Sequence, residues 1–319
     1  MKNLRKRIVA VLLGIGMILS SGSAVSAQEM TNDSFDSSTI ELTTIDLTTR
    51  EISDESISVG TETPENSRST FARKSVESQM QEAILPENYQ TFNNDQRDVR
   101  AIIGTDNRTR VTNTTSFPYS AICSIHVTYP DGSSYTGTGT VISRKTVMTA
   151  AHVIYNSGRG GFASRVTVSP GRNGTSYPLG TYNSTRLTML AKYATSTAAE
   201  NDVGFINVGT NIGSRTGIMG YGSYSDASLN AATLRLAGYP GDKTAGTLWT
   251  HTGKPNGLTT TLIRSPIDTT GGQSGSPLFM SNNQVVGIHC ETYNSSSNTA
   301  RRVDYSLFLL LQAIKAEDQ

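Results

Sequence analysis

Short runs of apolar and polar residues, rich in Val, Ile, Thr and Tyr, recur through the last two thirds of the chain. Examples are AICSIHVTY, SRVTVSP, DVGFINVG, ATLRLAGYP and QVVGIHCETY. Turn signals such as PDG, GRNGTS, PGDK and KPNG separate these runs. Short strands at such spacing are typical of β-sandwiches and β-barrels. The pattern therefore predicts an all-β fold.

The end of the chain has a different periodicity. The stretch VDYSLFLLLQAIKA places apolar residues three and four positions apart, the spacing of one face of a helix. Asp304 and Ser306 are candidate N-caps for it. We therefore expect a C-terminal helix over residues 304–317.

The first 27 residues have the three parts of a secretory signal peptide. A basic start is followed by the apolar run IVAVLLGIGMIL and by the small-residue site AVSA, which ends at Ala27. The apolar run is about 12 residues long, short of the roughly 20 that cross a bilayer. We expect residues 1–27 to be removed on secretion, leaving an extracellular protein without a membrane anchor.

Residues 28–100 differ in composition from the rest of the chain. They carry 15 acidic side chains, nine of them Glu, against six basic ones. Low hydrophobicity with a high net charge argues against an independent hydrophobic core. The segment is either a disordered linker or a removable pro-segment, and the residues that follow favour the second.

Residues 101–319 have 17 basic and 11 acidic side chains, and only Glu200, Glu291 and Glu317 are glutamates. An enzyme that cuts after Glu would digest itself less if it avoided Glu, but Glu is also disfavoured in β-rich proteins. The basic residues are scattered, which is typical of an ordinary solvated surface. No P-loop, HExxH or CxxC pair occurs, so we expect no nucleotide cofactor, no zinc and no nucleic-acid partner.

Three short segments carry the residue types that acyl transfer by a serine requires, namely a nucleophile, a base, and a carboxylate that orients the base. His152 lies in TVMTAAHVIY, Asp202 in ENDVGFINV and Ser274 in DTTGGQSGSP. Alone, each has an ordinary structural interpretation as a core His, a turn Asp or a loop Ser. Their order and local context together favour catalysis, since Gly272 and Gly275 permit the tight turns that an exposed nucleophile needs.

The segments TAAH, NDVG and GGQSGSP resemble the three catalytic segments of chymotrypsin-like serine proteases. Longer stretches, such as IIGTDNRTRVTNTTSFPY and LAGYPGDKTAGTLW, are similar to the secreted bacterial glutamyl endopeptidases of that superfamily. The similarity runs from about Ala101 to the C-terminal helix. It implies two six-stranded antiparallel β-barrels, over about 101–210 and 211–303, with the active site between them.

The resemblance also implies a role for each catalytic residue. Ser274 matches the nucleophile, His152 the general base and Asp202 the carboxylate that orients the base. The N–H groups of Gly272 and Ser274 match the oxyanion hole. Because the protease fold also occurs in proteins that only bind partners, a catalytically dead binding protein is the alternative.

For specificity, the resemblance implies that Thr269, His289 and the α-amino group of Ala101 bind the carboxylate of a substrate Glu or, more weakly, Asp. A hydroxyl and an imidazole can both donate hydrogen bonds to a carboxylate. The rival is Asp268, at the position where trypsin-like enzymes carry the carboxylate that attracts Arg and Lys. In close glutamyl relatives an Asp-Thr pair stands here as well, so we expect Asp268 to point away or to be satisfied locally.

Alignment through IIGTDNRTR makes Ala101 the mature N-terminus, so we expect an Arg-cutting protease to release it after Arg100. Trypsin-like zymogens pair the new amine with an Asp before the nucleophile, but Gln273 occupies that position here. We expect a monomer in which Cys123 and Cys290 are free, buried thiols. His126 and His251 are interpreted as structural or surface residues.

Overall fold

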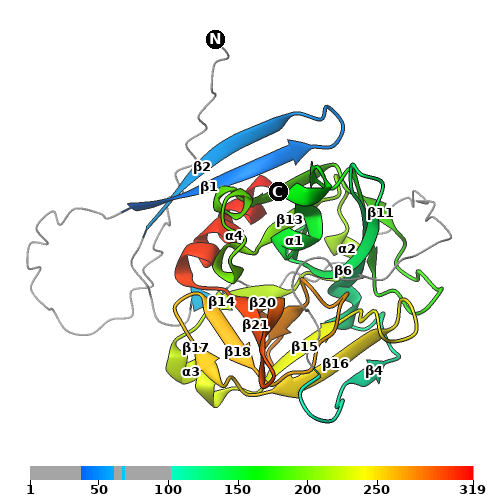
Figure 1. Ribbon diagram of the computed structural model, residues 1–319, viewed down its shortest axis with the longest axis vertical. Helices are drawn as coiled ribbons and strands as arrows, with labels where there is room; N and C mark the ends of the chain where they lie inside the picture. The colour runs from blue at the N-terminus through cyan, green and yellow to red at the C-terminus, as the bar shows by residue number, and fades with distance from the viewer. Residues whose placement is uncertain (1–36, 61–66, 69–101, 319) are drawn as a thin grey trace, which may run out of the picture.

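The Val-, Ile- and Thr-rich runs form strands that assemble into two large sheets, one above the other in Figure 1. The structure is a computed structural model that describes residues 37–60, 67–68 and 102–318. The expected signal peptide (1–27), the bond after Arg100 and Ala101 itself lie outside the described residues. In the described ranges, no helix has both the length and the apolar character to cross a membrane.

The first sheet contains nine strands, each antiparallel to its neighbours. In spatial order they are β11 (Tyr182–Asn183), β10 (Arg165–Pro170), β5 (Ile122–Thr128), β6 (Ser134–Val141), β7 (Thr146–Thr149), β13 (Gly204–Asn207), β12 (Arg186–Leu190), β1 (Ser37–Asp46) and β2 (Ile52–Gly60).

The second sheet contains ten strands. Its main path is β17 (Gly257–Leu258), β18 (Leu262–Ser265), β21 (Ser297–Arg302), β20 (Gln284–Asn294), β19 (Pro277–Phe279), β15 (Leu234–Gly238), β16 (Leu248–Gly253) and β4 (Thr109–Val111). Off this path, β14 (Gly220–Ser223) pairs in parallel with β20 and antiparallel with β3 (Ser67–Arg68). A separate two-stranded ribbon joins β8 (Tyr155–Asn156) and β9 (Gly161–Phe162).

The predicted all-β fold, with two antiparallel sheets and a C-terminal helix, is confirmed. Each sheet holds more than the six strands that were expected. The first gains the two-residue β11 and the strands β1 and β2, which precede residue 101, and the second gains the two-residue β17 and β3 together with the short strands β4 and β14. Strand β4 lies within the residues expected for the first barrel, yet it pairs with β16 of the second sheet. The residues that follow the expected mature N-terminus are therefore part of the second sheet.

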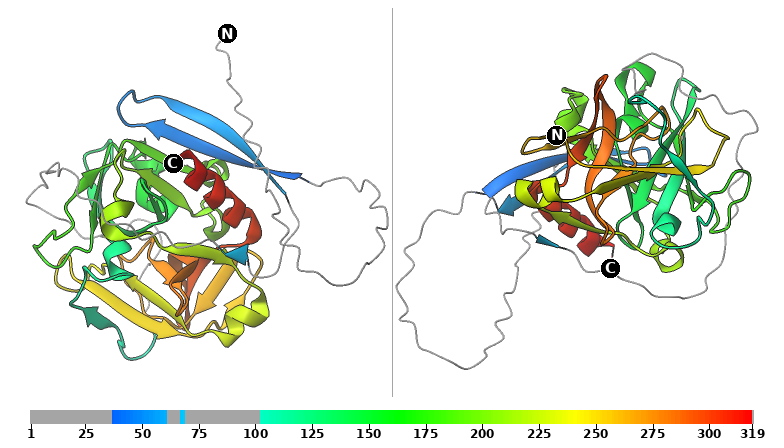
Figure 2. Two further views of the ribbon diagram at one scale, coloured as in Figure 1. Left: turned by 180° about the vertical axis from the view of Figure 1, so that it is seen from behind. Right: turned by 90° about the horizontal axis from the view of Figure 1, so that it is seen from below.

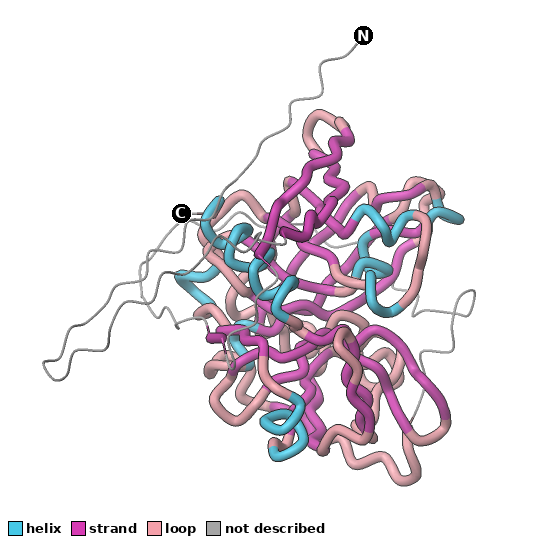
Figure 3. The backbone as a smooth tube through the Cα atoms, turned by 90° about the vertical axis from the view of Figure 1, so that its left-hand side faces the viewer, coloured by secondary structure: helices cyan, strands magenta, loops and turns pink. Residues whose placement is uncertain are grey.

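Helices are short apart from the last one, and Figure 3 shows strands throughout both halves of the molecule. Helix α4 (Tyr305–Glu317) follows the prediction closely, and the Asp304 side chain caps it by accepting a hydrogen bond from the Leu307 N–H at 2.8 Å. The other helices are α1 (Ala151–Ile154), α2 (Gly213–Thr216) and α3 (Asp226–Ala231), with 3-10 turns η1 (Tyr119–Ala121), η2 (Ser157–Arg159), η3 (Ala191–Ala194) and η4 (Ala199–Asn201).

Both cysteines are free and buried, as expected: Cys123 lies on β5 and Cys290 on β20. Burial raises the pKa of both thiols above their ordinary value. They are therefore core side chains, held in the uncharged form.

Strands β1 and β2 come from the acidic segment that precedes residue 101, and they form a hairpin on the edge of the first sheet. Strand β1 pairs antiparallel with β12, from Leu42 opposite Leu190 to Asp46 opposite Arg186. Figures 1 and 2 show the hairpin (blue) lying across α4 (red). The acidic segment thus forms structure by adding to a sheet that already has a core.

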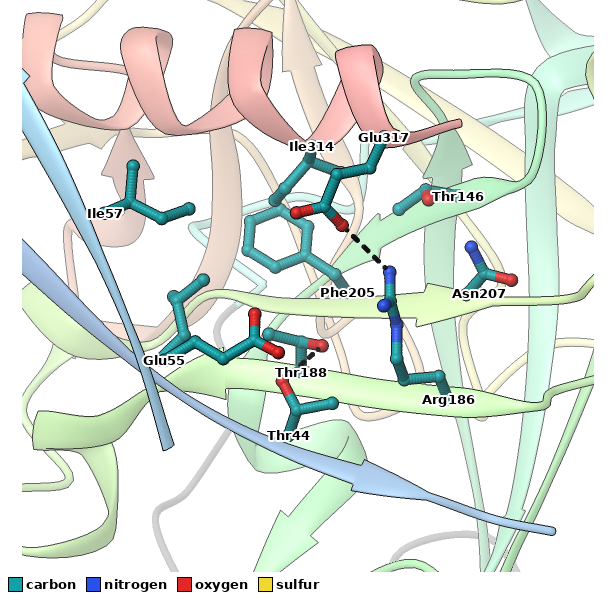
Figure 4. Close-up of a pocket in the computed structure, with 11 residues that line it drawn as sticks. Thr44, Glu55, Ile57, Thr146, Arg186, Thr188, Phe205, Asn207, Ile314 and Glu317 are labelled. Atoms are coloured by element: carbon teal, nitrogen blue, oxygen red, sulfur yellow. Dashed lines mark hydrogen bonds and ion pairs between the residues drawn. The ribbon is translucent and has the colours of Figure 1, made fainter. Parts of the chain in front are cut away.

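Apolar and polar contacts hold the hairpin in place. Leu42, Ile45 and Ile57 are buried in the main apolar cluster of the protein. Figure 4 shows Thr44 of the hairpin joined to Thr188 of β12, with their hydroxyl oxygens 3.0 Å apart. Leu42, Thr44, Ile57 and Thr188, with the C-terminal end of α4, line a cavity of about 20 Å³, which is enough for about one water molecule.

Candidate active site

His152 and Asp202 lie together where two neighbouring strands of the first sheet end. His152 is in α1, directly after β7, and Asp202 lies between η4 and β13. The Asp202 Oδ2 atom is 2.7 Å from His152 Nδ1, and Asp202 Oδ1 accepts a hydrogen bond from the backbone N–H of His152 at 2.9 Å. Asp202 is buried, whereas 22% of the His152 side chain is exposed. The carboxylate therefore fixes the ring and directs its Nε2 atom away from Asp202.

Ser274 lies in the glycine-rich loop between β18 and β19. Its carbonyl oxygen accepts a hydrogen bond from the N–H of Thr138 on β6, at 2.8 Å. A Cβ atom on Gly275 would lie 2.9 Å from the backbone nitrogen of Ala150, two residues before His152. Glycine at 275 thus allows the loop to pack directly against the segment that carries His152.

No hydrogen bond joins His152 Nε2 to Ser274 in the described part of the chain, where Nε2 has no partner. In unliganded enzymes such bonds are often long and shorten only when substrate binds. The structure therefore contains the His152–Asp202 pair, and the loop that carries Ser274 (the serine loop) packs against the segment that carries His152.

The four residues Thr270–Gln273 form a tight turn, closed by a hydrogen bond from the Gln273 N–H to the Thr270 carbonyl at 3.0 Å. Gly272 has a φ angle of 92°, which favours glycine and is typical of the third residue of a type II turn. A Cβ atom there would lie 2.5 Å from the Tyr239 carbonyl oxygen. Both the backbone angle and the space therefore require glycine at 272.

The orientation of the peptide between Gly271 and Gly272 determines where the Gly272 N–H points. The Gly271 carbonyl accepts a hydrogen bond from the Gly241 N–H at 2.6 Å, and in a trans peptide the N–H points the opposite way from the carbonyl. Within the described residues, neither the Gly272 N–H nor the Ser274 N–H donates to a protein acceptor. Two free backbone donors beside the serine are what an oxyanion hole needs.

Thr269 lies within the loop that carries Ser274, five residues before it, and His289 lies on β20, which borders this loop. The backbone of His289 on β20 bonds to the loop, through its carbonyl to the Gly275 N–H at 2.8 Å and through its N–H to the Ser276 carbonyl at 2.9 Å. Both side chains are buried, and in the described part of the chain neither Thr269 Oγ1 nor His289 Nε2 has a partner. Buried polar atoms are rarely left in this state unless a ligand or water completes them.

His289 is neutral in this state. Its pKa is lowered to about 4, mainly by burial and also by the nearby His152, while a hydrogen bond to the backbone of Thr299 and the Asp202 carboxylate act in the opposite direction. Because Nε2 is the unpartnered nitrogen, the bond to Thr299 uses Nδ1. In the neutral ring the proton therefore lies on Nδ1, and Nε2 presents a lone pair.

Asp268 is fully buried and its carboxylate is occupied. Its two oxygens accept hydrogen bonds from the N–H groups of Ile103 at 2.8 Å and Asn107 at 2.9 Å. His251 lies against it, with Nδ1 accepting from the Asp268 N–H at 2.9 Å. Asp268 thus anchors the segment that follows Ala101, and His251 has a structural role.

Sequence reasoning missed Arg108, whose side chain is fully buried behind the serine loop. Its guanidinium donates to Thr270 and Gln273 of the turn and forms ion pairs with Asp106 and Asp242. Gln273, the residue before the nucleophile, is neutral and cannot form an ion pair. This indicated that another residue makes the charged contact in this loop. No local pattern marks Arg108 as that group, because Asp242 lies 134 positions further along the chain.

Comparison with known proteins identifies the family of the chain. A trypsin-like peptidase domain model matches residues 137–288. The glutamyl endopeptidase of Bacillus licheniformis is 47% identical over 181 residues, which cover 57% of this chain and 55% of that protein. The match thus spans about half the length of that relative.

Two further relatives match over more of their own length. The extracellular metalloprotease of Bacillus subtilis is 37% identical over 217 residues, covering 66% of this chain and 69% of that protein. The glutamyl endopeptidase of Staphylococcus epidermidis is 30% identical over 205 residues, covering 61% of this chain and 69% of that protein. Among the residues described here, no group of three or more His, Cys, Asp or Glu side chains is placed to hold a metal ion.

A solved structure of a Glu endopeptidase in complex with MPD superimposes with a TM-score of 0.61 at 31% identity, covering 68% of this chain and all of that one. A protease from Arthrobacter nicotinovorans, 21% identical with a TM-score of 0.55, shares the fold. The chain therefore belongs to the glutamyl endopeptidase family of chymotrypsin-like serine endopeptidases.

Proposed function

We propose that this protein is a secreted endopeptidase that cleaves peptide bonds after Glu, and more weakly after Asp. Ser274 Oγ attacks the carbonyl carbon of the scissile bond while its proton passes to His152 Nε2, and Asp202 stabilises the charged ring. The N–H groups of Gly272 and Ser274 stabilise the oxyanion. His152 then protonates the leaving amine, and water hydrolyses the acyl-enzyme by the same steps.

One observation carries the preference for Glu: among the described residues, two buried polar side chains without a protein partner belong to the Ser274 loop and to the strand bonded to it, namely Thr269 in the loop and His289 on β20. A substrate carboxylate would complete both of them, provided that His289 takes up a proton on Nε2. The alternative pocket residue, Asp268, supports no preference for Arg, because its two oxygens are already bonded to backbone N–H groups.

We also propose that the active form begins at Ala101, released by a protease that cuts after Arg. Ala101 lies outside the described residues, but Ile103, two positions on, is bonded to Asp268, the neighbour of Thr269. An α-amino group at residue 101 would then lie near the same pocket and add positive charge toward a bound carboxylate.

Peptides that differ only in P1, as Glu, Gln, Asp, Arg and Leu, test this function. Glu should exceed Gln by at least tenfold, because Gln has the same shape without the charge, and one charge-assisted hydrogen bond contributes roughly 1.5–3 kcal/mol. Asp should be slower than Glu, since its shorter side chain leaves the carboxylate out of reach.

Variants identify the residues responsible. His289→Gln should depress cleavage after Glu and leave cleavage after Leu nearly unchanged, whereas His126→Gln, at another buried histidine, should alter neither preference. Ser274→Ala should abolish all turnover. Preference for Arg in the parent enzyme would overturn the proposal, and a folded, processed protein that cleaves none of the peptides would favour the binding-protein alternative.

A further inference from the structure

Arg108 connects the start of the protease domain to the loop that forms the oxyanion hole. Its Nη1 atom donates to Thr270 Oγ1 at 2.9 Å and to Gln273 Oε1 at 3.0 Å. Thr270 and Gln273 are the first and last residues of the turn that contains Gly272. The guanidinium therefore contacts both ends of this turn.

The other contacts of Arg108 reach the peptide that orients the Gly272 N–H. Arg108 Nη2 is 2.5 Å from Asp242 Oδ2, and Asp242 Oδ1 accepts a further hydrogen bond from Thr270 Oγ1 at 2.5 Å. The residue before Asp242 is Gly241, whose N–H holds the Gly271 carbonyl at 2.6 Å. Arg108 thus fixes both the turn and the segment against which the central peptide of the turn is bonded.

Turning that central peptide over would convert the type II turn to a type I turn and direct the Gly271 carbonyl, instead of the Gly272 N–H, toward the substrate. The two turns differ little in intrinsic stability, so the surrounding contacts decide between them. The buried guanidinium is well suited to this task, because it has five donors in a rigid arrangement and acceptors on Asp106, Asp242, Thr270 and Gln273.

These contacts are present in the chain before any cut after Arg100, with the hairpin of the acidic segment still in place. Arg108 is held through its own side chain and needs no free α-amino group to make them. We propose that Arg108 is a positioning residue that keeps the oxyanion hole formed, and that it does so before the chain is cut after Arg100. Cleavage then completes only the pocket that binds the P1 side chain. The inference rests on the proposed function, since it concerns the same nucleophile.

A small fluorophosphonate without a P1 side chain separates the oxyanion hole from the pocket. Ser274 Oγ attacks phosphorus, the O–P bond forms as the P–F bond breaks, fluoride leaves, and the hydroxyl proton passes to His152. The rate constant for inactivation is compared between the mature enzyme and a precursor that carries Arg100→Gln. We expect the precursor to be labelled within about tenfold of the mature rate, although it cleaves Glu peptides at least a hundredfold more slowly.

Arg108→Met should slow labelling of both forms by about a hundredfold, the effect of losing one oxyanion donor. In the mature enzyme it should lower kcat with little change in KM. Arg108→Lys, which keeps the positive charge but not the planar guanidinium with its five donors, should recover part of the labelling rate. Arg110→Met, at an exposed arginine two residues on, is the matched control and should label like the parent.

Arg108→Met removes the ion-pair partner of Asp242. Gln273→Met is therefore a second variant that disturbs the turn but keeps the ion pairs of Arg108 with Asp106 and Asp242. It should also slow labelling. Because it leaves the buried Thr270 N–H without its acceptor, thermal unfolding is measured to show that the variant is still folded under the labelling conditions. A precursor labelled more than a hundredfold slower than the mature enzyme, or rapid labelling of folded Arg108→Met and Gln273→Met proteins, would overturn the inference. Failure of the mature parent to label, or to prefer Glu, would instead refute the proposed function.

Discussion

A neutral, buried imidazole with an unprotonated Nε2 governs how the proposed pocket responds to pH. A bare lone pair cannot donate to a carboxylate, so His289 must take up a proton when a Glu side chain binds through Nε2. The pKa of His289 is about 4 in the free enzyme, and a bound carboxylate at hydrogen-bond distance raises it. Between these two pKa values, binding of Glu consumes one proton.

Because binding of Glu takes up a proton, a rise in pH should weaken that binding. As the pH rises above 6, kcat/KM for a Glu peptide should fall relative to kcat/KM for the matching Leu peptide, by up to tenfold per pH unit. The ratio cancels any pH dependence of the catalytic steps that both substrates share. Steady-state kinetics from pH 6 to 9 measure it directly.

The α-amino group of Ala101 would also lose its charge in this range, since such groups have a pKa near 8. The His289→Gln variant isolates that contribution, because it keeps the amine and removes the imidazole. A ratio that is independent of pH in the parent, or one that falls equally in the variant, would show that His289 does not take up the proton.

At the level of elements, the hairpin of β1 and β2 depends on the domain that it joins. Leu42 is 3% exposed and packs in the main apolar cluster, whereas Ile52 in the same hairpin is 63% exposed. Leu42→Ala should weaken docking by about 2 kcal/mol or more, which favours local opening by roughly 30-fold. Hydrogen exchange should then quicken over β1 and over β12.

Ile52→Ala is the matched control for this experiment and should leave exchange in both strands unchanged. Equal protection in the Leu42→Ala and parent proteins would mean that Leu42 does not hold the hairpin on the sheet. The mature active site should be unaffected by either substitution, because both residues precede the expected cleavage after Arg100.

The sequence predicts elements where a periodic pattern and a boundary signal coincide. Helix α4 begins and ends within one residue of its prediction, because its apolar spacing follows a capping Asp304. The hairpin was not predicted, since the acidic segment lacks a core of its own and buries its few apolar side chains against other strands. Likewise, nothing within Thr109–Val111 indicates that it pairs with β16, a strand more than 130 residues away.

The candidate site likewise has residues that the sequence predicts and residues that it does not. His152, Asp202 and Ser274 lie in recognisable short segments, and the structure places the first two in contact. Arg108 and the anchoring of the chain by Asp268 depend on pairs more than 130 positions apart. Charge and local pattern do not specify such pairs, which arise only when the second sheet has formed.

At the scale of the whole molecule, the distribution of glutamates matters if the enzyme cuts after Glu as proposed. Glu51 lies exposed at the tip of the hairpin, where chains are most open to proteolysis. Of the three glutamates in the protease domain, Glu291 lies within β20, Glu317 ends α4 and is paired with Arg186, and Glu200 has the buried neighbours Ala199 and Asn201.

We therefore expect the first cut among the described glutamates to fall after Glu51. The substrate is the inactive Ser274→Ala precursor, treated with a trace of mature enzyme and followed by mass spectrometry of the intact chain. Glu51→Gln should remove this product and serves as the control. Initial cleavage after Glu200, Glu291 or Glu317 would contradict the expectation.

Loss of the hairpin changes the first sheet in a way that concerns the behaviour of the mature enzyme in solution. While β1 is present, it occupies the side of β12 that faces away from β13. Without it, β12 becomes an edge strand of five residues with unpaired N–H and C=O groups, and such edges can pair with extended strands of other molecules. Leu190 and Thr188, half-buried beneath the hairpin, become more exposed at the same time. The mature enzyme should therefore self-associate more readily than its precursor as its concentration rises, because the hairpin that covers this edge in the precursor would be gone.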